Sequence, residues 1–169
     1  MNDNSAKTKQ DLEQIFQVSL QHKPSYFQIR FIGIANNGKE VIRLDKTNET
    51  VVLSNDLQEK GDTEYFNEGI KMNKGEFYFS QINLNEEHGL ISEPYTPTLR
   101  AASPVFNVKN EKLGIVVINV DLTQFFKTLK KISGTELEFY LIDSQGQYLF
   151  ANNNNLVCDF GMIYYPLGF

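Results

Sequence analysis

Residues 75–121 read GEFYFSQINLNEEHGLISEPYTPTLRAASPVFNVKNEKLGIVVINVD, and this stretch decides the fold class of the chain. Two runs rich in β-forming residues flank a polar segment, and the last run, Leu113–Val120, is apolar almost without interruption. Aliphatic residues at successive positions predict a central strand that is covered on both faces. A short turn at Asn110-Glu111 predicts a hairpin, so we expect an antiparallel sheet with Gly114–Val120 near its centre.

Helical patterns lie on either side of the predicted strands. Apolar residues recur at helical spacing in Asp11–Leu20 and again in Leu122–Ile132, which predicts two amphipathic helices that bracket the sheet. On the first helix, Leu12, Ile15 and Phe16 form an apolar stripe that is too costly to leave in water. We therefore expect this stripe to pack on the core or to hold two copies of the chain together as a homodimer.

The sequence YFQIRFIGIANNGKEVIRLDK predicts a β-hairpin, because Asn37-Gly38 is a strong signal for a two-residue turn. With that loop, Ile32 lies opposite Arg43, and Arg30 lies opposite Asp45. All four side chains then share one face of the sheet, because side chains alternate along a strand. A structural salt bridge between Arg30 and Asp45 is the expected use of that pair.

Length, composition and charge limit the class of protein. The 169 residues, 41% of them hydrophobic, suffice for one domain with additional segments. A net charge of −5 argues against a general nucleic-acid binder, and the single Cys158 excludes an intramolecular disulfide and a cysteine-based zinc cluster. The chain has neither a run of about 18 apolar residues nor the apolar segment of a signal peptide, so we expect no transmembrane segment or leader within it.

Motifs typical of catalysis are absent from the sequence. It contains no glycine-rich phosphate loop, no GxSxG elbow and no HExxH pair. Asp121 and Asp143 end two β runs, where capping of the following helix or turn explains them better than acid–base chemistry. His88 follows Glu86 and Glu87, and an exposed turn explains this group better than a metal site. We therefore expect no enzyme, no metal site and no cofactor.

Five segments in sequence order carry a family resemblance. The segments YFQIRFIG…NGKEVIRLD, LQEKGDTEYF, GEFYFSQINLN, PTLRAASPVFN and LGIVVINVDL resemble the membrane-distal module of double Cache sensor domains. These are extracytoplasmic parts of bacterial histidine kinases, diguanylate cyclases and chemoreceptors. The resemblance covers roughly Asp11–Leu122. It implies an α+β, PAS-like fold: a five-stranded antiparallel sheet, an N-terminal helix and a helical connection on the ligand face.

The resemblance also implies a division of the chain. Residues 1–10 are expected to form a disordered tail and residues 11–133 the sensor domain. Residues 134–169 are expected to be the incomplete start of a second, similar module. Within them, Leu137–Phe150 repeats the pattern of the opening hairpin around Gly146.

The function implied by the resemblance is sensing. A small molecule would bind between the sheet and the helical connection, on the extracytoplasmic side of a transmembrane receptor, and shift flanking helices that reach the membrane outside this chain. Amino-acid-binding members place an arginine just before the aromatic pair, where this chain has Asp62-Thr63-Glu64. The resemblance therefore carries no amino-acid-type pocket over to this chain. The alternative function is a cytoplasmic PAS-like interaction module that dimerises or docks a partner without a ligand.

A ligand pocket is expected between the sheet and the segment Leu57–Gly75. Arg100 lies in a run of small and apolar residues, where its guanidinium can bind a carboxylate in bidentate fashion. An ion pair of purely structural use is the alternative, because a buried charge needs a partner in either case. The aromatic candidates can equally belong to the core, and the polar ones can cap strand ends. The expected ligand-binding residues are Arg100, Tyr65, Phe66, Tyr78, Ser80 and Asn83.

Overall fold

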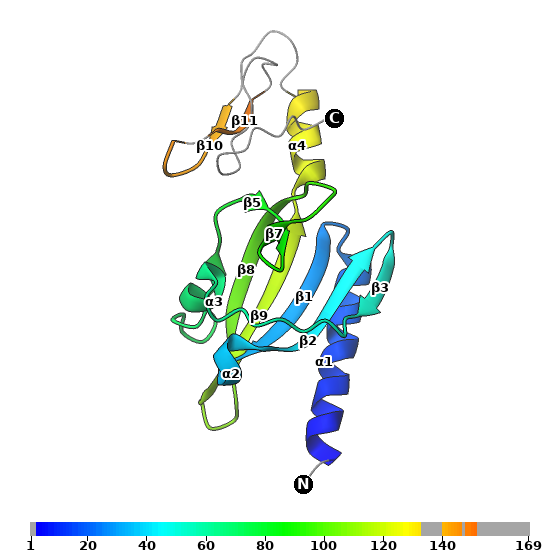
Figure 1. Ribbon diagram of the computed structural model, residues 1–169, viewed down its shortest axis with the longest axis vertical. Helices are drawn as coiled ribbons and strands as arrows, with labels where there is room; N and C mark the ends of the chain where they lie inside the picture. Colours follow the sequence, from blue (N-terminus) through cyan, green and yellow to red (C-terminus); the bar gives the residue numbers. More distant parts are fainter. Residues whose placement is uncertain (1–2, 133–139, 147, 152–169) are drawn as a thin grey trace. The chain divides into compact units, whose positions relative to one another are not determined.

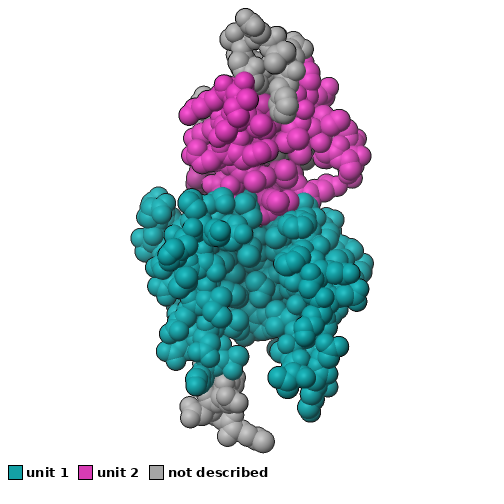
Figure 2. Space-filling view, turned by 180° about the vertical axis from the view of Figure 1, so that it is seen from behind, with its two compact units in different colours: residues 1–80, 100–120 teal, residues 81–99, 121–169 magenta. Residues whose placement is uncertain are grey.

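The computed structural model describes residues 3–132, 140–146 and 148–151, which fall into two compact units. Unit 1 comprises Met1–Ser80 and Arg100–Val120, and unit 2 comprises Gln81–Leu99 and Asp121–Phe169 (Figure 2, teal and magenta). Among the described residues, no helix has both the length and the apolar character needed to span a bilayer.

An antiparallel sheet forms the framework of unit 1, with the strand order β3-β2-β1-β9-β8-β4 (Figure 1). β9 lies between β1 and β8, so the predicted central position of the last apolar run is confirmed. Its Ile115 and Val117 are fully buried on one face, and Val116 and Ile118 are partly buried on the other. The strands are β1 (Tyr26–Gly33), β2 (Glu40–Thr47), β3 (Thr50–Leu53), β4 (Tyr78–Phe79), β8 (Pro97–Phe106) and β9 (Lys112–Asp121).

The α+β class and the antiparallel PAS-like sheet are as predicted, but the number of strands is not. The sheet has seven strands rather than five: β3 joins it in unit 1, and β5 (Asn83–Leu84) pairs with the part of β8 that belongs to unit 2. β3 forms because the chain reverses at Asn48 and Glu49, both with positive φ, and pairs with β2. β5 arises because the first of the two predicted β-rich runs, Gly75–Ile82, is interrupted. Only Tyr78–Phe79 of this run is a strand, and β5 then pairs with Pro97 and Thr98 of β8.

One face of the unit 1 sheet packs against helix α1 (Asp3–His22). Phe16 and Leu20 of the helix are buried there together with Ile29, Ile42 and Leu44 of the sheet. The helix begins at Asp3, so residues 3–10, expected to be a disordered tail, are helical. Of the predicted apolar stripe, Phe16 is buried against the sheet, whereas Ile15 is 59% exposed. The residues before Asp11 extend the same backbone hydrogen-bond pattern.

The opposite face of this sheet is covered by the connection between β3 and β4, which crosses in front of the strands in Figure 1. This connection contains helix α3 (Glu64–Gly69), which starts directly after Thr63. Tyr65 and Phe66 of α3 pack on Ile32, Ala102 and other buried side chains of the sheet. The expected helical connection over one face is therefore present.

The turn between β1 and β2 differs from the predicted two-residue loop. It comprises Ala35–Gly38 (α2 in Figure 1), in which Asn36, Asn37 and Gly38 all have positive φ. The backbone N–H groups of Lys60 and Gly61 donate to the carbonyls of Gly38 and Asn37, at 2.9 and 3.0 Å. The turn is thus held by a segment that is distant in the sequence. A prediction from the local Asn-Gly pair cannot take this segment into account.

The longer turn changes the register of the hairpin. Arg30 lies opposite Arg43 rather than Asp45, and a bulge places Ile32 opposite Glu40. The shift keeps Arg30 and Arg43 on one face, as predicted, because a slip of two residues does not exchange the faces of a strand. The expected pairing of Arg30 with Asp45 is therefore wrong, although both side chains are used in ion pairs.

Unit 2 has its own apolar core. Helix α4 (Thr123–Ile132) is present as predicted, and the Asp121 carboxylate caps it by accepting from the Thr123 N–H at 2.8 Å. The remaining strands are β6 (Glu86–Glu87), β7 (Leu90–Ile91), β10 (Tyr140–Ile142) and β11 (Tyr148–Ala151). β10 and β11 form the expected hairpin with Gly146 in its turn, and residues 133–139, 147 and 152–169 of the expected second module lie outside the described residues. The core consists of Leu84, Phe126, Leu149 and Phe150, with further apolar residues around it.

Candidate ligand-binding site

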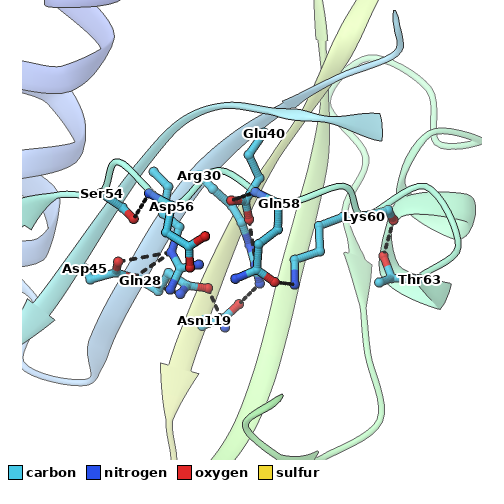
Figure 3. Close-up of polar contacts among 11 residues, drawn as sticks. Gln28, Arg30, Glu40, Asp45, Ser54, Asp56, Gln58, Lys60, Thr63 and Asn119 are labelled. Atoms are coloured by element: carbon cyan, nitrogen blue, oxygen red, sulfur yellow. Dashed lines mark hydrogen bonds and ion pairs between the residues drawn. The ribbon is translucent and has the colours of Figure 1, made fainter. Parts of the chain in front are cut away.

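Polar and charged side chains occupy the sheet face opposite α1 in unit 1. Ile29, Ile42 and Leu44 point toward α1, so the alternating residues Arg30 and Arg43 must point the other way. On an ordinary core face these positions would be apolar. Here they carry a connected network of hydrogen bonds that also reaches into the connection above the sheet (Figure 3).

Arg30 lies in the middle of this network and is 2% exposed. Its Nη1 donates to Glu40 Oε1 at 3.1 Å, and its Nη2 donates to Asn119 Oδ1 at 3.0 Å. The second oxygen of Glu40 accepts from the backbone N–H of Gln58 at 3.0 Å, and Gln58 Oε1 accepts from Lys60 Nζ at 2.7 Å. The buried ion pair thereby ties β1 and β2 to β9 and to the connection.

A second branch of the network runs toward β2. Asn119 Nδ2 donates to Gln28 Oε1 at 3.0 Å, and Gln28 Nε2 donates to Asp45 Oδ1 at 2.8 Å. Arg43 Nε lies 3.0 Å from both oxygens of Asp45. Together the two branches join three strands and the connection through hydrogen bonds that each involve a polar side chain.

The buried charges on this face are predominantly positive. Among the residues that the structure describes, the charged side chains classed as buried are Arg30, Arg43, Lys60, Arg100 and Glu40. Asp45 adds a partly exposed carboxylate beside Arg43. Burying charge in a low-dielectric interior is unfavourable unless it is compensated, so each of these side chains needs polar or charged partners.

Arg100 and Tyr65, two of the residues predicted from the sequence, come together in unit 1. Arg100 on β8 is 5% exposed, and its Cζ lies 5.7 Å from the centroid of the Tyr65 ring. Arg30 Cζ lies 5.2 Å from the same ring. Guanidinium groups at such distances interact favourably with an aromatic face. Tyr65 is therefore the common neighbour of two buried arginines.

Ser80 and Tyr78 support this arrangement through hydrogen bonds. Ser80 Oγ accepts from the Arg100 backbone N–H at 3.0 Å, which fixes the backbone beside the guanidinium. Tyr78 packs on the cluster that contains Tyr65 and Phe66, and its hydroxyl donates to Glu64 at 2.8 Å. Burial, and next the hydrogen bond to Glu64, raises the pKa of Tyr78 to about 12. Its hydroxyl is therefore a donor at neutral pH.

Asn83 does not belong to this group. It lies on β5 in unit 2, is exposed, and pairs with Thr98. The other five predicted residues all lie in unit 1, where the core cluster and the contacts of Arg100 connect them.

Several members of the network were not predicted from the sequence. Glu40 directly follows the turn, Lys60 lies in the connection, and Asn119 interrupts an otherwise apolar strand. In a strand whose residues are apolar on both faces, a single polar residue stands out in the sequence and indicates a buried hydrogen bond. Asn119 is such a residue. Glu40 and Lys60 carry no such signal, because charged residues next to turns are usually solvated.

Comparisons with known proteins connect this fold to bacterial sensory domains. A domain assigned to a sensory box/GGDEF family protein from Vibrio parahaemolyticus has a TM-score of 0.73 at 23% identity, over 89% of this chain and 57% of that one. The periplasmic sensory domain of the Campylobacter jejuni chemoreceptor Tlp1 has a TM-score of 0.65 at 16% identity, over 87% and 57%. The sensory domain of the C. jejuni chemoreceptor Tlp3, with isoleucine bound, has a TM-score of 0.53 at 10% identity, over 90% and 65%.

These similarities show a shared fold, and the chain spans less than two thirds of the length of each of the three structures. No curated protein matches the sequence. The family described as the sensor domain of bacterial histidine kinases matches residues 1–164, which is nearly the whole chain. The chain therefore belongs to the bacterial histidine kinase sensor-domain family.

Proposed function

We propose that this chain is the ligand-sensing part of a bacterial transmembrane receptor and that it binds a small anion, a carboxylate, on the polar face of the unit 1 sheet. It lies on the extracytoplasmic side and has no catalytic role of its own. The observation that carries the proposal is the burial of Arg100 beside Tyr65 on a face where buried cations outnumber buried carboxylates. A guanidinium in such surroundings binds a carboxylate strongly, because water competes little there.

The proposed binding residues are those predicted from the sequence. Arg100 supplies charge, Tyr65 and Phe66 an apolar wall, and Tyr78 and Ser80 polar groups. Asn83, which lies in unit 2, is not part of this proposed site. The bound isoleucine of the C. jejuni Tlp3 domain shows that this fold accommodates a small molecule with a carboxylate in that protein.

The relay of ligand binding to the helices is also part of the proposal. Lys46 on β2 directly follows Asp45 of the polar network, and its Nζ donates to the carbonyls of Leu20, Lys23 and Pro24 at 2.9–3.0 Å. This lysine holds the carboxyl end of α1, where a cation is favourable. A shift of β2 on ligand binding therefore moves the carboxyl end of α1, and with it the helix, whose amino-terminal end leads toward the membrane in the full receptor.

Replacing Arg100 by alanine is expected to abolish stabilisation by small carboxylates while the protein stays folded. A ligand that binds only the native state at a concentration 100-fold above its dissociation constant stabilises by about 2.7 kcal/mol. Thermal unfolding with and without a panel of carboxylates measures this shift. In the same samples, amide hydrogen exchange near the carboxyl end of α1 should change with ligand in the wild type only.

The control variant for this experiment is Lys71→Ala, which removes an exposed cation paired with Glu68 on the surface. It should leave carboxylate stabilisation unchanged. Should Arg100→Ala unfold the domain while no carboxylate stabilises the wild type, Arg100 is a structural ion-pair residue, and the ligand-free interaction module becomes the better description. If carboxylates stabilise the wild type but do not change amide hydrogen exchange in α1, the proposed relay is wrong and the proposed ligand binding stands.

Association of two copies through α1 is the second part of the proposed function to be tested. Phe16 is buried against the sheet, whereas Ile15 and Val18 are 59% and 54% exposed on the outer side of the helix. Exposed apolar residues on one helix face favour self-association. Sedimentation velocity should show a dimer at high concentration that Ile15→Glu converts to a monomer. A wild-type chain that is monomeric at every concentration would contradict the proposed homodimer.

The second module beginning at residue 134 likewise remains a prediction. Its described part, the β10–β11 hairpin, follows helix α4 as the β1–β2 hairpin follows α1. A structure of the full receptor that continued this hairpin into another architecture would contradict it.

A further inference from the structure

We propose that the Nε–H group of Arg30 donates a hydrogen bond to an uncharged oxygen of the ligand, a hydroxyl or a carbonyl group. The ligand is then a hydroxy or oxo acid rather than an amino acid or an unsubstituted acid. This inference rests on the proposed binding of a carboxylate at Arg100 and adds the second polar group of the ligand. The sequence predicts only a structural salt bridge for Arg30, and the structure gives it that bond, to Glu40.

A buried donor without an acceptor carries the inference. Arg30 is 2% exposed, its Nη1 donates to Glu40 and its Nη2 donates to Asn119. Its Nε is also buried and makes no hydrogen bond to any residue that the structure describes. A buried N–H without an acceptor is unfavourable, and such groups in folded proteins nearly always have a partner. We therefore expect the acceptor to come from a bound molecule.

The acceptor that suits Arg30 Nε is uncharged. The charge of Arg30 is already balanced by the carboxylate of Glu40, whose side chain is 0% exposed. A second carboxylate at Nε would add a negative charge to a buried pair that is neutral as a whole, and burying an unbalanced charge is unfavourable. A hydroxyl or carbonyl oxygen accepts the hydrogen bond without changing the charge of the pair.

An ammonium group does not suit this position. It has N–H donors only, so it cannot accept from Arg30 Nε. It would also meet like charges, because Arg43 on β2 lies directly opposite Arg30 in the ladder. The carboxylates of the polar network already accept from these arginines, Glu40 from Arg30 and Asp45 from Arg43. The network therefore favours an oxygen over an amino group on the ligand.

Tyr65 connects this position to the proposed carboxylate site. The Cζ atoms of Arg30 and Arg100 lie 5.2 and 5.7 Å from the centroid of its ring. A ligand beside Tyr65 therefore has a guanidinium group for its carboxylate and an N–H donor for its oxygen. The ring supplies an apolar surface for the carbon atoms that join these two groups.

Isothermal titration calorimetry at constant ionic strength tests the ligand class. The probes are propionate and butyrate, their hydroxy and 2-oxo derivatives, and the corresponding amino acids. Chain length and oxygen position both vary, because the distances to Tyr65 do not define the separation of the two guanidinium groups. At least one hydroxy or oxo acid should bind the wild type about tenfold more tightly than its parent acid, because its oxygen gains a charge-assisted hydrogen bond. The matching amino acid should bind no more tightly than the parent acid.

Arg30→Lys keeps the positive charge beside Glu40 but lacks the Nε donor. In this variant, the preferred hydroxy or oxo acid and its parent acid should bind with affinities within about twofold of each other. Lys71→Arg, a conservative change of an exposed residue, is the control and should retain the wild-type preference.

The Nε–H signal of Arg30 in ¹H–¹⁵N spectra of the wild type reports the contact directly. Addition of the preferred hydroxy or oxo acid should shift this signal and slow its exchange with water, because the donor gains an acceptor. Addition of the parent acid should change it much less. This measurement leaves Arg30 in place, so it decides the inference even if Arg30→Lys does not fold.

The outcomes separate the two proposals. If the parent acids bind the wild type and no hydroxy or oxo derivative binds more tightly, carboxylate binding at Arg100 stands and the inference about Arg30 is wrong. If a hydroxy or oxo acid is preferred but the Nε–H signal does not respond, or a folded Arg30→Lys retains the preference, Arg30 is not the second contact. Binding of none of these acids overturns both proposals.

Discussion

Glu40→Gln is expected to lower the free energy of unfolding by about 4 kcal/mol, a large part of the stability of a domain of this size. The Glu40 side chain is 0% exposed, and its two oxygens accept from Arg30 Nη1 and from the Gln58 backbone N–H. A glutamine has only one acceptor oxygen, so one of these donors would face an NH₂ group. The charge of Arg30 would also remain buried without its carboxylate. Urea unfolding followed by far-UV circular dichroism measures the change.

Two controls show whether the buried charge causes this loss. Glu68→Gln removes a carboxylate from an exposed pair with Lys71 and should cost about 0.5 kcal/mol or less. The double change Arg30→Met with Glu40→Leu should cost less than Glu40→Gln alone, because neither charge is then left unpaired in the interior. A loss below about 1 kcal/mol in Glu40→Gln would show that the pair does not hold the connection to the sheet.

Gly114→Ala is expected to destabilise unit 1 by about 3 kcal/mol or to prevent folding, because no side chain fits at this point of β9. A Cβ on Gly114 would overlap the carbonyl oxygen of Ile32 on the neighbouring strand and lie 2.9 Å from Phe31 Cε2. The carbonyl belongs to the backbone of β1, which the sheet holds on both sides, so it cannot move away without breaking the pairing of β1 with β9.

The matched control is the glycine directly opposite. Gly33 pairs with Gly114 in the ladder, and a Cβ there would meet Val41 Cγ2 and the Lys39 carbonyl oxygen at ordinary contact distances of 3.4 and 3.9 Å. Gly33→Ala should therefore change the unfolding free energy by less than about 1 kcal/mol. Equal losses for the two variants would mean that strand flexibility, and not the contact with Ile32, requires glycine at position 114.

Features that depend on neighbouring residues could be predicted from the sequence. The apolar run of β9 indicated its central position, the helical spacing of residues 122–132 indicated α4, and Asp121 was recognised as the cap of that helix. Each of these depends on side-chain periodicity or on a hydrogen bond between residues close in sequence. The strand count was wrong because pairing of two-residue strands such as β4 and β5 depends on what lies beside them.

The candidate site could be predicted only in part. Arg100, Tyr65, Phe66, Tyr78 and Ser80 lie together in unit 1 as expected, because they occupy strands and a helix whose positions the sequence pattern indicates. Asn83 lies in unit 2, because the β-rich run that precedes it is interrupted after Phe79. The participation of Glu40, Lys60 and Asn119 follows from contacts between segments far apart in the chain.

The sequence by itself determined which side chains share a face, and the tertiary structure decided which of them meet. Arg30 and Arg43 lie on the same face under either register of the hairpin, because strand alternation has a period of two. The partner of Arg30 changed from Asp45 to Glu40 because Lys60 and Gly61 hold the preceding turn in a longer form. Side-chain direction is a property of the local backbone, whereas a hydrogen-bond partner depends on register, and here a distant segment sets the register.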